Sequence, residues 1–247
     1  MSDGKTLITI ATYNERENLP LLVDETQRAL PDAEILVIDD NSPDGTGQWC
    51  DDRAAADPRV RCLHRTGKLG LGTAIIAGMK FAIEQGYEFV INMDADFSHH
   101  PRYLPALRAG MQPTDGRPAV DCMIGSRYVA GGGVEGWPFK RRMMSKSINA
   151  YTRTMLGLKP NDCSGAFRCY RVAKLAQLDF SKLRARGYAF QQEMLWQLKQ
   201  IGCRFAETPI TFADRTRGQS KINSREALAA LWHIGSMGIR ARLPFTK

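Results

Sequence analysis

Two carboxylate residues, Asp94 and Asp96, stand at the end of a short apolar run, residues 89–93, of the kind that a buried strand uses. Carboxylates this close repel each other and lose hydration, so both stay ionised cheaply only beside a cation. Carboxylate oxygens suit a hard divalent ion, and such an ion is usually shared with substrate phosphates. A solvated turn after a strand carries the same pattern, so the surrounding segments must decide between the two interpretations.

The surrounding sequence alternates between strand patterns and helix patterns. The predicted strands of the first half cover residues 7–11, 35–38, 60–64 and 89–93. The predicted helices between them cover residues 15–30, 46–56 and 73–85. The later predicted helices cover residues 103–109, a stretch that ends at residue 158, residues 188–201 and residues 224–242. The later predicted strands cover residues 121–124 and 205–212. Residues 131–133 are expected to be flexible, and residues 162–170 are expected to form a loop that leads into a strand. The alternation predicts a parallel α/β sheet with right-handed connections.

Three of the predicted strands end in polar groups, at residues 12–15, 39–46 and 94–100. Ligands of parallel sheets bind beyond the carboxyl ends of the strands, and these ends meet at one edge of the sheet. The sequence therefore predicts that the three polar segments converge on one ligand site.

A glycine-rich loop, residues 67–72, precedes the third predicted helix but does not fit a nicotinamide-binding fingerprint. That fingerprint belongs between the first strand and the first helix, where this sequence has no glycine, and Ile75 stands where its third glycine or alanine is expected. The sequence has no Walker A motif either. We interpret the loop as a segment that approaches the ligand closely, with Lys68 supplying positive charge.

The chain of 247 residues suits one large α/β domain, and 43% of its residues are hydrophobic and 24% charged. No membrane span or signal peptide is recognisable, so a cytoplasmic location is expected. The six cysteines have no CxxC or zinc-site spacing and are expected to be reduced and mostly buried. The four histidines form no ligand motif.

Charge is distributed unevenly along the chain. Residues 1–100 contain 9 Lys or Arg and 17 Asp or Glu, whereas residues 101–247 contain 25 and 9. An acidic half that holds a metal, joined to a basic half, suggests a polyanionic ligand between them. Nucleic acid is not expected as that ligand, because the sequence has no recognition-helix motif, RNP motif or regular aromatic spacing.

The strongest basic segment, residues 137–159, contains six Lys or Arg and no Asp or Glu. A solvated helix face is the simplest interpretation of such a run. Trp137 and Phe139 lie beside three consecutive cations, however, at residues 140–142. This mixture suits the edge of an anionic membrane or a lipid phosphate.

Eight short motifs give the sequence a family resemblance. In chain order they are TYNE (12–15), DDNSPDGT (39–46), KLGLGTA (68–74), DADFSHHP (94–101), GSRY (125–128), SGAFR (164–168), FQQEM (190–194) and DRTRGQSK (214–221). In this order they resemble the family 2 GT-A glycosyltransferases, and within them the dolichyl- and polyprenyl-phosphate mannose synthases. Members often have proline before TYNE, where this chain has Ala11, which removes a rigid turn but no catalytic group. The chain resembles the catalytic-domain-only type, without C-terminal membrane spans.

The resemblance implies a single GT-A domain with a mostly parallel central sheet flanked by helices. Residues 1–125 would bind the nucleotide sugar, and residues 126–247, with an amphipathic C-terminal helix, would bind the acceptor. The cofactor would be Mg²⁺ or Mn²⁺, held by Asp96 with Ser98. The implied catalytic residues are Asp94, Asp96, Arg127 and Arg215. The implied donor-binding residues are Ala11, Tyr13, Glu15, Val37, Asp39, Lys68, Asp94, Ala95, Asp96, Arg127, Arg215 and Lys221. The implied acceptor-phosphate residues are Arg127, Lys140, Arg141 and Arg142.

The resemblance also implies an inverting, metal-dependent transfer of mannose from GDP-mannose to dolichyl or polyprenyl phosphate. A phosphate monoester is largely a dianion at neutral pH, so it needs positioning by cations more than a strong base. The enzyme would be bound peripherally at the cytoplasmic face of a membrane, either directly or through a membrane partner subunit.

Three alternatives remain open at this point. The donor is UDP-glucose or another nucleotide sugar in the first, and the acceptor is a saccharide or a protein in the second. A saccharide acceptor needs a catalytic base, for which Glu193 and Asp162 are the candidate carboxylates. In the third alternative the chain is a catalytically silent nucleotide-sugar sensor or a partner-binding subunit.

Overall fold

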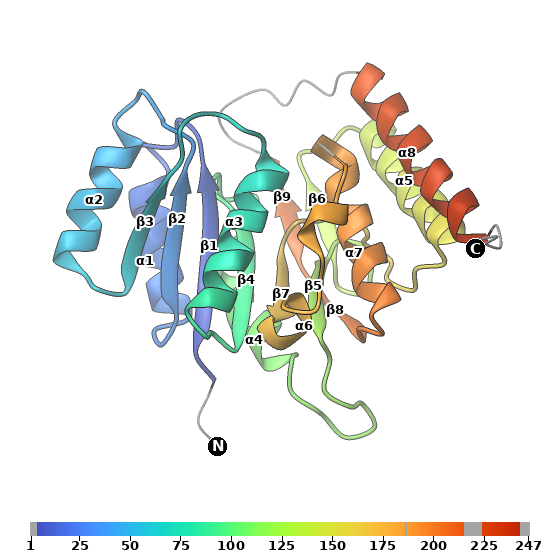
Figure 1. Ribbon diagram of the computed structural model, residues 1–247, viewed down its shortest axis with the longest axis horizontal. Helices are drawn as coiled ribbons and strands as arrows, with labels where there is room; N and C mark the ends of the chain where they lie inside the picture. Colours follow the sequence, from blue (N-terminus) through green and yellow to red (C-terminus); the bar gives the residue numbers. More distant parts are fainter. Residues whose placement is uncertain (1–3, 186, 215–223, 243–247) are drawn as a thin grey trace.

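The computed structural model describes residues 4–185, 187–214 and 224–242, which are built around a seven-stranded sheet (Figure 1). The strand order is β3-β2-β1-β4-β7-β5-β8, and every strand runs parallel to the others except β7. The bounds are β1 (Thr6–Thr12), β2 (Glu34–Asp39), β3 (Val60–His64), β4 (Phe89–Asp94), β5 (Cys122–Ser126), β7 (Arg168–Arg171) and β8 (Phe205–Pro209). The prediction of a mostly parallel central sheet flanked by helices is confirmed.

Helices cover both faces of this sheet because successive strand residues point to opposite sides and both sides are apolar. Ile8 and Ile10 of β1 pack into one group of buried side chains, whereas Leu7 packs into the other. The helices of the first group are α1 (Leu19–Ala29), α2 (Thr46–Ala56) and α4 (Leu104–Ala109), and those of the second include α3 (Leu71–Glu84), α6 (Val172–Leu175) and α7 (Phe190–Gln200). Each fully buried leucine or isoleucine contributes about 1.5–3 kcal/mol, so this double core fixes the positions of the strand ends.

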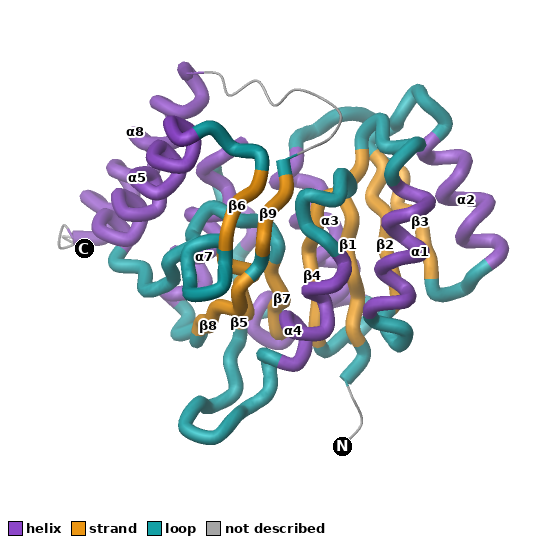
Figure 2. Tube along the Cα trace, turned by 180° about the vertical axis from the view of Figure 1, so that it is seen from behind, coloured by secondary structure: helices purple, strands orange, loops and turns teal. Residues whose placement is uncertain are grey.

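Two long helices, α5 (Phe139–Leu156) and α8 (Ser224–Arg242), lie side by side at the end of the molecule away from α2 (Figures 1 and 2). The Tyr151 hydroxyl of α5 donates a hydrogen bond to the carbonyl of Leu231 in α8 (3.1 Å). A Cβ atom at Gly238 would lie 2.6 Å from the carbonyl oxygen of Met155, so glycine permits this close approach. None of the described helices combines the length and apolar character that crossing a membrane would require.

The structure corrects three predicted elements. The single strand expected at 205–212 is two strands, because β8 ends at Pro209 and the chain then pairs elsewhere, as β9 (Thr211–Ala213) with β6 (Gly133–Glu135). Residues 131–133, expected to be flexible, lead into β6. The first helix begins at Leu19 rather than at residue 15, since residues 15–18 form a turn after Asn14, whose φ is +62°.

Candidate functional site

The carboxyl ends of β1, β2 and β4 lie side by side at one edge of the sheet. Ala11 of β1 pairs with Asp94 of β4, and Thr12 of β1 pairs with Asp39 of β2. The predicted convergence of the three polar segments is therefore confirmed. Because β1 lies between β2 and β4, the carboxylates of Asp39 and Asp94 flank it on either side.

Hydrogen bonds join the first two polar segments into one surface. The backbone N–H of Asn14 donates to Ser42 Oγ (3.0 Å), and that of Glu15 donates to Thr46 Oγ1 (3.1 Å). Ser42 in turn donates to Asp39 through its backbone N–H (3.1 Å) and its hydroxyl (2.5 Å). The buried Asp39 carboxylate is thus held in one orientation at the strand end.

The glycine-rich loop reaches the same edge. The ammonium of Lys68 lies 4.3 Å from the centre of the Tyr13 ring, so a residue of this loop meets the first polar segment directly. Arg65, just before the loop, forms an ion pair with Asp40 (Nη1 to Oδ1, 2.8 Å). Burial raises the pKa of Asp40, and Arg65 opposes that increase.

Four of the donor-site residues implied by the family resemblance are buried, namely Val37, Asp39, Ala95 and Arg127. Val37 is fully buried in the core on the α1 side of the sheet, two residues before the end of β2. Ala95 is also buried, in the turn between Asp94 and Asp96. Tyr13 and Lys68, by contrast, lie on the surface.

The turn after β4 is braced by its own side chains. Asp96 Oδ1 accepts hydrogen bonds from the Ser98 backbone N–H (3.1 Å) and from the Ser98 hydroxyl. The Nδ1 atom of buried His99 accepts a hydrogen bond from the Asp94 backbone N–H (3.0 Å). Burial lowers the pKa of His99, so the ring is neutral and carries its proton on Nε2. His99 therefore supports the turn without cancelling the negative charge of the two carboxylates.

This turn suits a hard divalent cation. Asp94 and Asp96 are both half-buried, and carboxylate and hydroxyl oxygens are the donors that Mg²⁺ and Mn²⁺ prefer. One short turn supplies too few oxygens to enclose an ion, so the remaining ligands would be water or substrate oxygens. The residues present fit an ion that is shared with a diphosphate.

Arg127 follows β5 and is fixed by a buried carboxylate. Its Nε and Nη2 atoms donate to the two carboxylate oxygens of Asp162, both at 2.7 Å, and Nη2 also donates to Ser164 Oγ (2.8 Å). Burial opposes ionisation of the fully buried Asp162, but the Arg127 guanidinium holds the pKa of this carboxyl below its usual range. The pair orients Arg127 and neutralises much of its charge.

An aromatic cluster connects the β4 turn to the start of α5. The His99 ring stacks on Phe167 (centroids 4.9 Å apart) and meets Phe212 edge-on (5.5 Å). Phe212 meets Trp137 edge-on (5.5 Å), and the guanidinium of Arg127 lies 5.5 Å from both of these ring centres. The acidic turn and the basic second half are therefore joined by one continuous cluster.

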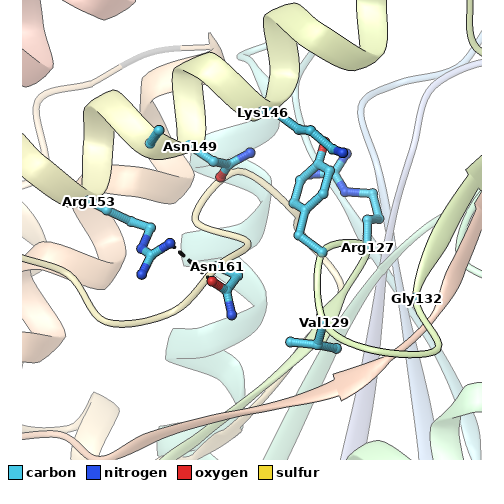
Figure 3. Close-up of a pocket in the computed structure, with 9 residues that line it drawn as sticks. Arg127, Val129, Gly132, Lys146, Asn149, Arg153 and Asn161 are labelled. Atoms are coloured by element: carbon cyan, nitrogen blue, oxygen red, sulfur yellow. Dashed lines mark hydrogen bonds between the residues drawn. The ribbon is translucent and has the colours of Figure 1, made fainter. Parts of the chain in front are cut away.

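A cavity of about 370 Å³ lies beside Arg127, between α5 and two loops (Figure 3). Lys146 and Arg153 extend from α5 toward the loops, and Arg153 donates to Asn161 Oδ1 (3.0 Å). The lining residues are Arg127, Tyr128, Val129, Gly132, Lys146, Asn149, Ala150, Arg153 and Asn161. The lining includes three cations and no carboxylate, so the cavity suits an anion.

The three consecutive cations at the start of α5 lie outside this lining. Arg141 forms an ion pair with Asp214 (2.7 Å) and lies 4.1 Å from the centre of the Trp137 ring. Arg142 donates to the Val134 carbonyl (2.9 Å), and Lys140 is exposed. Arg215 and Lys221, which the resemblance places in the donor site, lie outside the described residues.

Lys146, Arg153 and His99 were not predicted from the sequence to be binding residues. Residues 146, 149, 150 and 153 have the spacing of one helix face, and this signal could have identified the α5 side of the cavity. The role of His99 has no comparable signal, because it depends on burial beneath Phe212, more than 100 residues further along the chain.

Comparisons with known proteins show the family of this chain. The model of the family "Glycosyl transferase family 2" matches residues 7–179. A polyprenol monophosphomannose synthase of Mycolicibacterium smegmatis is 43% identical over 97% of this chain and 89% of the relative. An undecaprenyl-phosphate mannosyltransferase of Micrococcus luteus is 42% identical over 97% of this chain and 99% of the relative.

Solved structures with much lower identity share the fold. Glucosyl-3-phosphoglycerate synthase from Mycobacterium tuberculosis, solved with Mn²⁺, UDP and phosphoglyceric acid, superposes with a TM-score of 0.64. It is 17% identical, and the match covers 98% of this chain and 80% of that one. A mannosyltransferase from Pyrobaculum calidifontis, solved with GDP-Man and Mn²⁺, has a TM-score of 0.63 at 16% identity, covering 96% of this chain and 64% of that one.

Proposed function

Because this chain belongs to glycosyl transferase family 2, we propose that it is the enzyme that transfers mannose from GDP-mannose to a polyprenyl phosphate. Its GT-A fold and its family make it a glycosyltransferase. One observation supports mannose transfer to a lipid phosphate in particular. The aromatic cluster connects the acidic β4 turn to Arg127, and a cationic cavity lies beside Arg127. Such a junction suits a reaction between two phosphate-bearing substrates.

We propose that the nucleotide diphosphate of the donor binds across the ends of β1, β2 and β4. The fixed carboxylate of Asp39 is placed to accept hydrogen bonds from ribose or base, and Lys68 with Tyr13 covers the same edge. Asp94 and Asp96, helped by Ser98, would hold Mg²⁺ or Mn²⁺ next to the diphosphate. The bound ion would neutralise the charge that develops on departing GDP.

The acceptor phosphate, in this proposal, enters the cavity beside Arg127. An oxygen of the phosphate dianion attacks the anomeric carbon, the bond to GDP breaks with its electrons leaving on the diphosphate, and the configuration inverts. Arg127 positions the nucleophile, because its orientation is fixed by Asp162, while Lys146 and Arg153 supply the net positive charge. Positioning and charge neutralisation account for the catalysis without a general base.

The two carboxylates that could serve a saccharide acceptor are already engaged. Asp162 is fully buried against Arg127. Glu193 is 3% exposed, accepts hydrogen bonds from the backbone N–H groups of Arg184 (3.0 Å) and Ala185 (2.5 Å), and faces His233 (3.5 Å). Neither can approach an acceptor hydroxyl, and this favours a phosphate acceptor, which needs no base.

We further propose that the protein binds peripherally at the cytoplasmic face of a membrane, where a polyprenyl phosphate resides. The paired helices α5 and α8 expose large apolar side chains, with Phe139 78% exposed and Trp232 74% exposed. Lys140 lies next to Phe139, so apolar and cationic groups share this end of the molecule. That combination suits an anionic bilayer surface.

The decisive experiment incubates purified protein with radiolabelled GDP-mannose and a short polyprenyl phosphate, with Mn²⁺ or with EDTA. We expect label in an organic-extractable lipid only when metal and both substrates are present. A parallel reaction with UDP-glucose tests the alternative donor. Faster transfer from UDP-glucose, or transfer to a saccharide in place of the lipid, would contradict the proposal.

A further inference from the structure

Four side chains capable of acid–base or nucleophilic chemistry gather between β3, the outer edge strand of the sheet, and the helix α2. Cys62 and His64 lie on β3, and Cys50 and Asp51 lie on α2, which packs directly against that strand (Figures 1 and 2). This cluster lies beyond β2, on the far side of it from the Asp94–Asp96 turn, and the proposed transfer reaction does not use it.

Three of these groups form a hydrogen-bonded relay. Asp51 Oδ1 lies 2.8 Å from His64 Nε2, and the other ring nitrogen, Nδ1, lies 3.9 Å from the sulfur of Cys62. A nucleophile next to a base that a third group orients is the arrangement that activates a cysteine. Cys50 packs in the same group of side chains as Cys62, and its thiol interacts with the Cys62 sulfur.

Of the six cysteines, Cys62 has the thiol pKa and the exposure that most favour reaction. The interaction with Cys50, followed by the nearby His64, lowers the pKa of Cys62 even though burial opposes this. Burial raises the pKa of Cys203 to about 11 and that of Cys163 and Cys169 to about 12. Cys62 is half-buried, whereas the other five cysteines are buried. Thiolate character and access therefore coincide at Cys62 alone.

We propose that Cys62 is a hydroperoxide-reactive cysteine and that Cys50 is its resolving partner. The Cys62 thiolate attacks the terminal oxygen of the peroxide, an S–O bond forms as the O–O bond breaks, and the departing alkoxide, or hydroxide from hydrogen peroxide, takes a proton from the His64 imidazolium. The Cys50 sulfur then attacks the sulfenic acid, the S–S bond forms, and the hydroxyl leaves as water with the Cys50 proton. In sum, two thiols and one hydroperoxide give one disulfide, one water and one alcohol, or two waters from hydrogen peroxide.

The location connects this chemistry to the donor site. In the β2–β3 register Cys62 pairs with Val37 and His64 pairs with Asp39. A Cβ atom at Gly47 would lie 3.0 Å from Asp39 Oδ2 and 3.3 Å from His64 Cε1, so the Gly47 backbone lies against both the Asp39 carboxylate and the His64 ring. A disulfide that draws α2 toward β3 would therefore disturb Asp39. This consequence rests on the proposed function, whereas the thiol chemistry does not.

The test begins with reduced, EDTA-treated wild-type protein and a brief iodoacetamide pulse at pH 7, with each cysteine quantified by peptide mass spectrometry. Cys62 should be alkylated first. His64→Gln should slow this reaction about tenfold, because it removes the group beside Cys62 that lowers the thiol pKa, and the thiolate fraction falls tenfold for each unit by which the pKa rises. The control is Asp52→Asn, an exposed carboxylate on α2 that bonds Gln48, and it should leave the rate unchanged.

A second measurement adds one equivalent of hydrogen peroxide. We expect a Cys50–Cys62 disulfide that dithiothreitol reverses, and in Cys50→Ser a sulfenic acid at Cys62 that a dimedone probe traps. Alkylation of Cys62 no faster than that of Cys203, or the lack of this disulfide, would overturn the proposal. Stoichiometric zinc in the protein as purified, bound by both sulfurs and protecting them, would overturn it too. GDP binding, measured before and after oxidation, should weaken several-fold if the proposed donor site is also correct.

Discussion

Arg127 and Asp162 form a two-point ion pair in which Nε and Nη2 each lie 2.7 Å from a different carboxylate oxygen. The pair joins the end of β5 to the loop that precedes β7, across 35 positions of sequence. Asp162 has no exposed surface, and its backbone N–H is held by Glu207 of β8 (2.9 Å). The pair therefore acts as a fixed joint between three segments and determines where the guanidinium faces.

Removing the carboxylate charge should destabilise the fold strongly. Asp162→Asn leaves Arg127 buried without its partner, and breaking a buried pair in this way typically costs about 3–5 kcal/mol. Urea unfolding followed by circular dichroism measures the change. Glu84→Gln, an exposed position on α3, is the control and should leave the midpoint unchanged. Equal midpoints for parent and Asp162→Asn would show that the pair contributes nothing net.

The contribution of this pair should also depend on pH. The folded-state pKa of Asp162 lies below its unfolded value, so the folded protein binds fewer protons here and stability rises with pH across that interval. The difference in unfolding free energy between parent and Asp162→Asn should be constant above about pH 5, and it should shrink below about pH 3.9, the usual aspartate value. A difference that grows on acidification would contradict this assignment.

Asp96→Asn should abolish most of the activity while the protein stays folded. The amide keeps an acceptor for Ser98 but removes one negative charge from the proposed metal site. Metal stabilisation of the transition state is worth several kcal/mol, so transfer should fall by about 100-fold or more. Isothermal titration of GDP with and without Mn²⁺ provides the second measurement. Metal-dependent GDP binding of parental strength in the variant would rule out Asp96 as a ligand.

The two cations on the α5 face of the cavity should control acceptor binding. Lys146→Gln with Arg153→Gln should raise the KM for polyprenyl phosphate about tenfold, because a charge-assisted hydrogen bond contributes about 1.5–3 kcal/mol. The donor KM should stay unchanged, and Lys80→Gln on α3 is the control. The competing variant replaces residues 140–142 by Gln. If the acceptor KM rises in that triple variant and stays unchanged in the double variant of Lys146 and Arg153, the acceptor phosphate binds at the start of α5 and not in the cavity.

The exposed apolar side chains of α5 and α8 should hold the protein on vesicles. Phe139→Ser with Trp232→Ser should reduce flotation with vesicles that contain anionic lipid, since each removes a large exposed ring. Leu21→Ser, which removes an exposed apolar side chain from α1 at the other end of the molecule, is the control. Unchanged flotation of the double variant, or equal loss in the control, would contradict membrane contact through these helices.

The arrangement of residues 1–125 was predictable from sequence because its information is local. Each of the three polar segments directly follows an apolar run, and parallel strands place their carboxyl ends together without further information. The start of the second helix at Thr46 and the extent of β3 agree with the prediction for the same reason. The metal assignment to Asp96 and Ser98 and the donor assignment of Lys68 stay predictions.

The arrangement of residues 126–247 was less predictable because its contacts join distant segments. The partner of Arg127 is Asp162, and the aromatic neighbour of His99 is Phe212, pairs that only the tertiary structure brings together. The break between β8 and β9 depends on how Pro209 meets the end of β5. The relay at Cys62 was missed because its members lie on two different elements, α2 and β3, and no metal or thiol motif has that spacing.

The position of β5 in the sheet has a consequence for synthesis of the chain. In the part of the chain that the structure describes, β5 pairs with β7 and β8 and not with β4, so both of its partners emerge later in translation. Until residue 171 has been made, the outer edge of β4 is also unpaired. Open edges of this kind recruit strands from other chains. A chain that terminates between residues 126 and 168 would therefore expose open strand edges and be prone to aggregate.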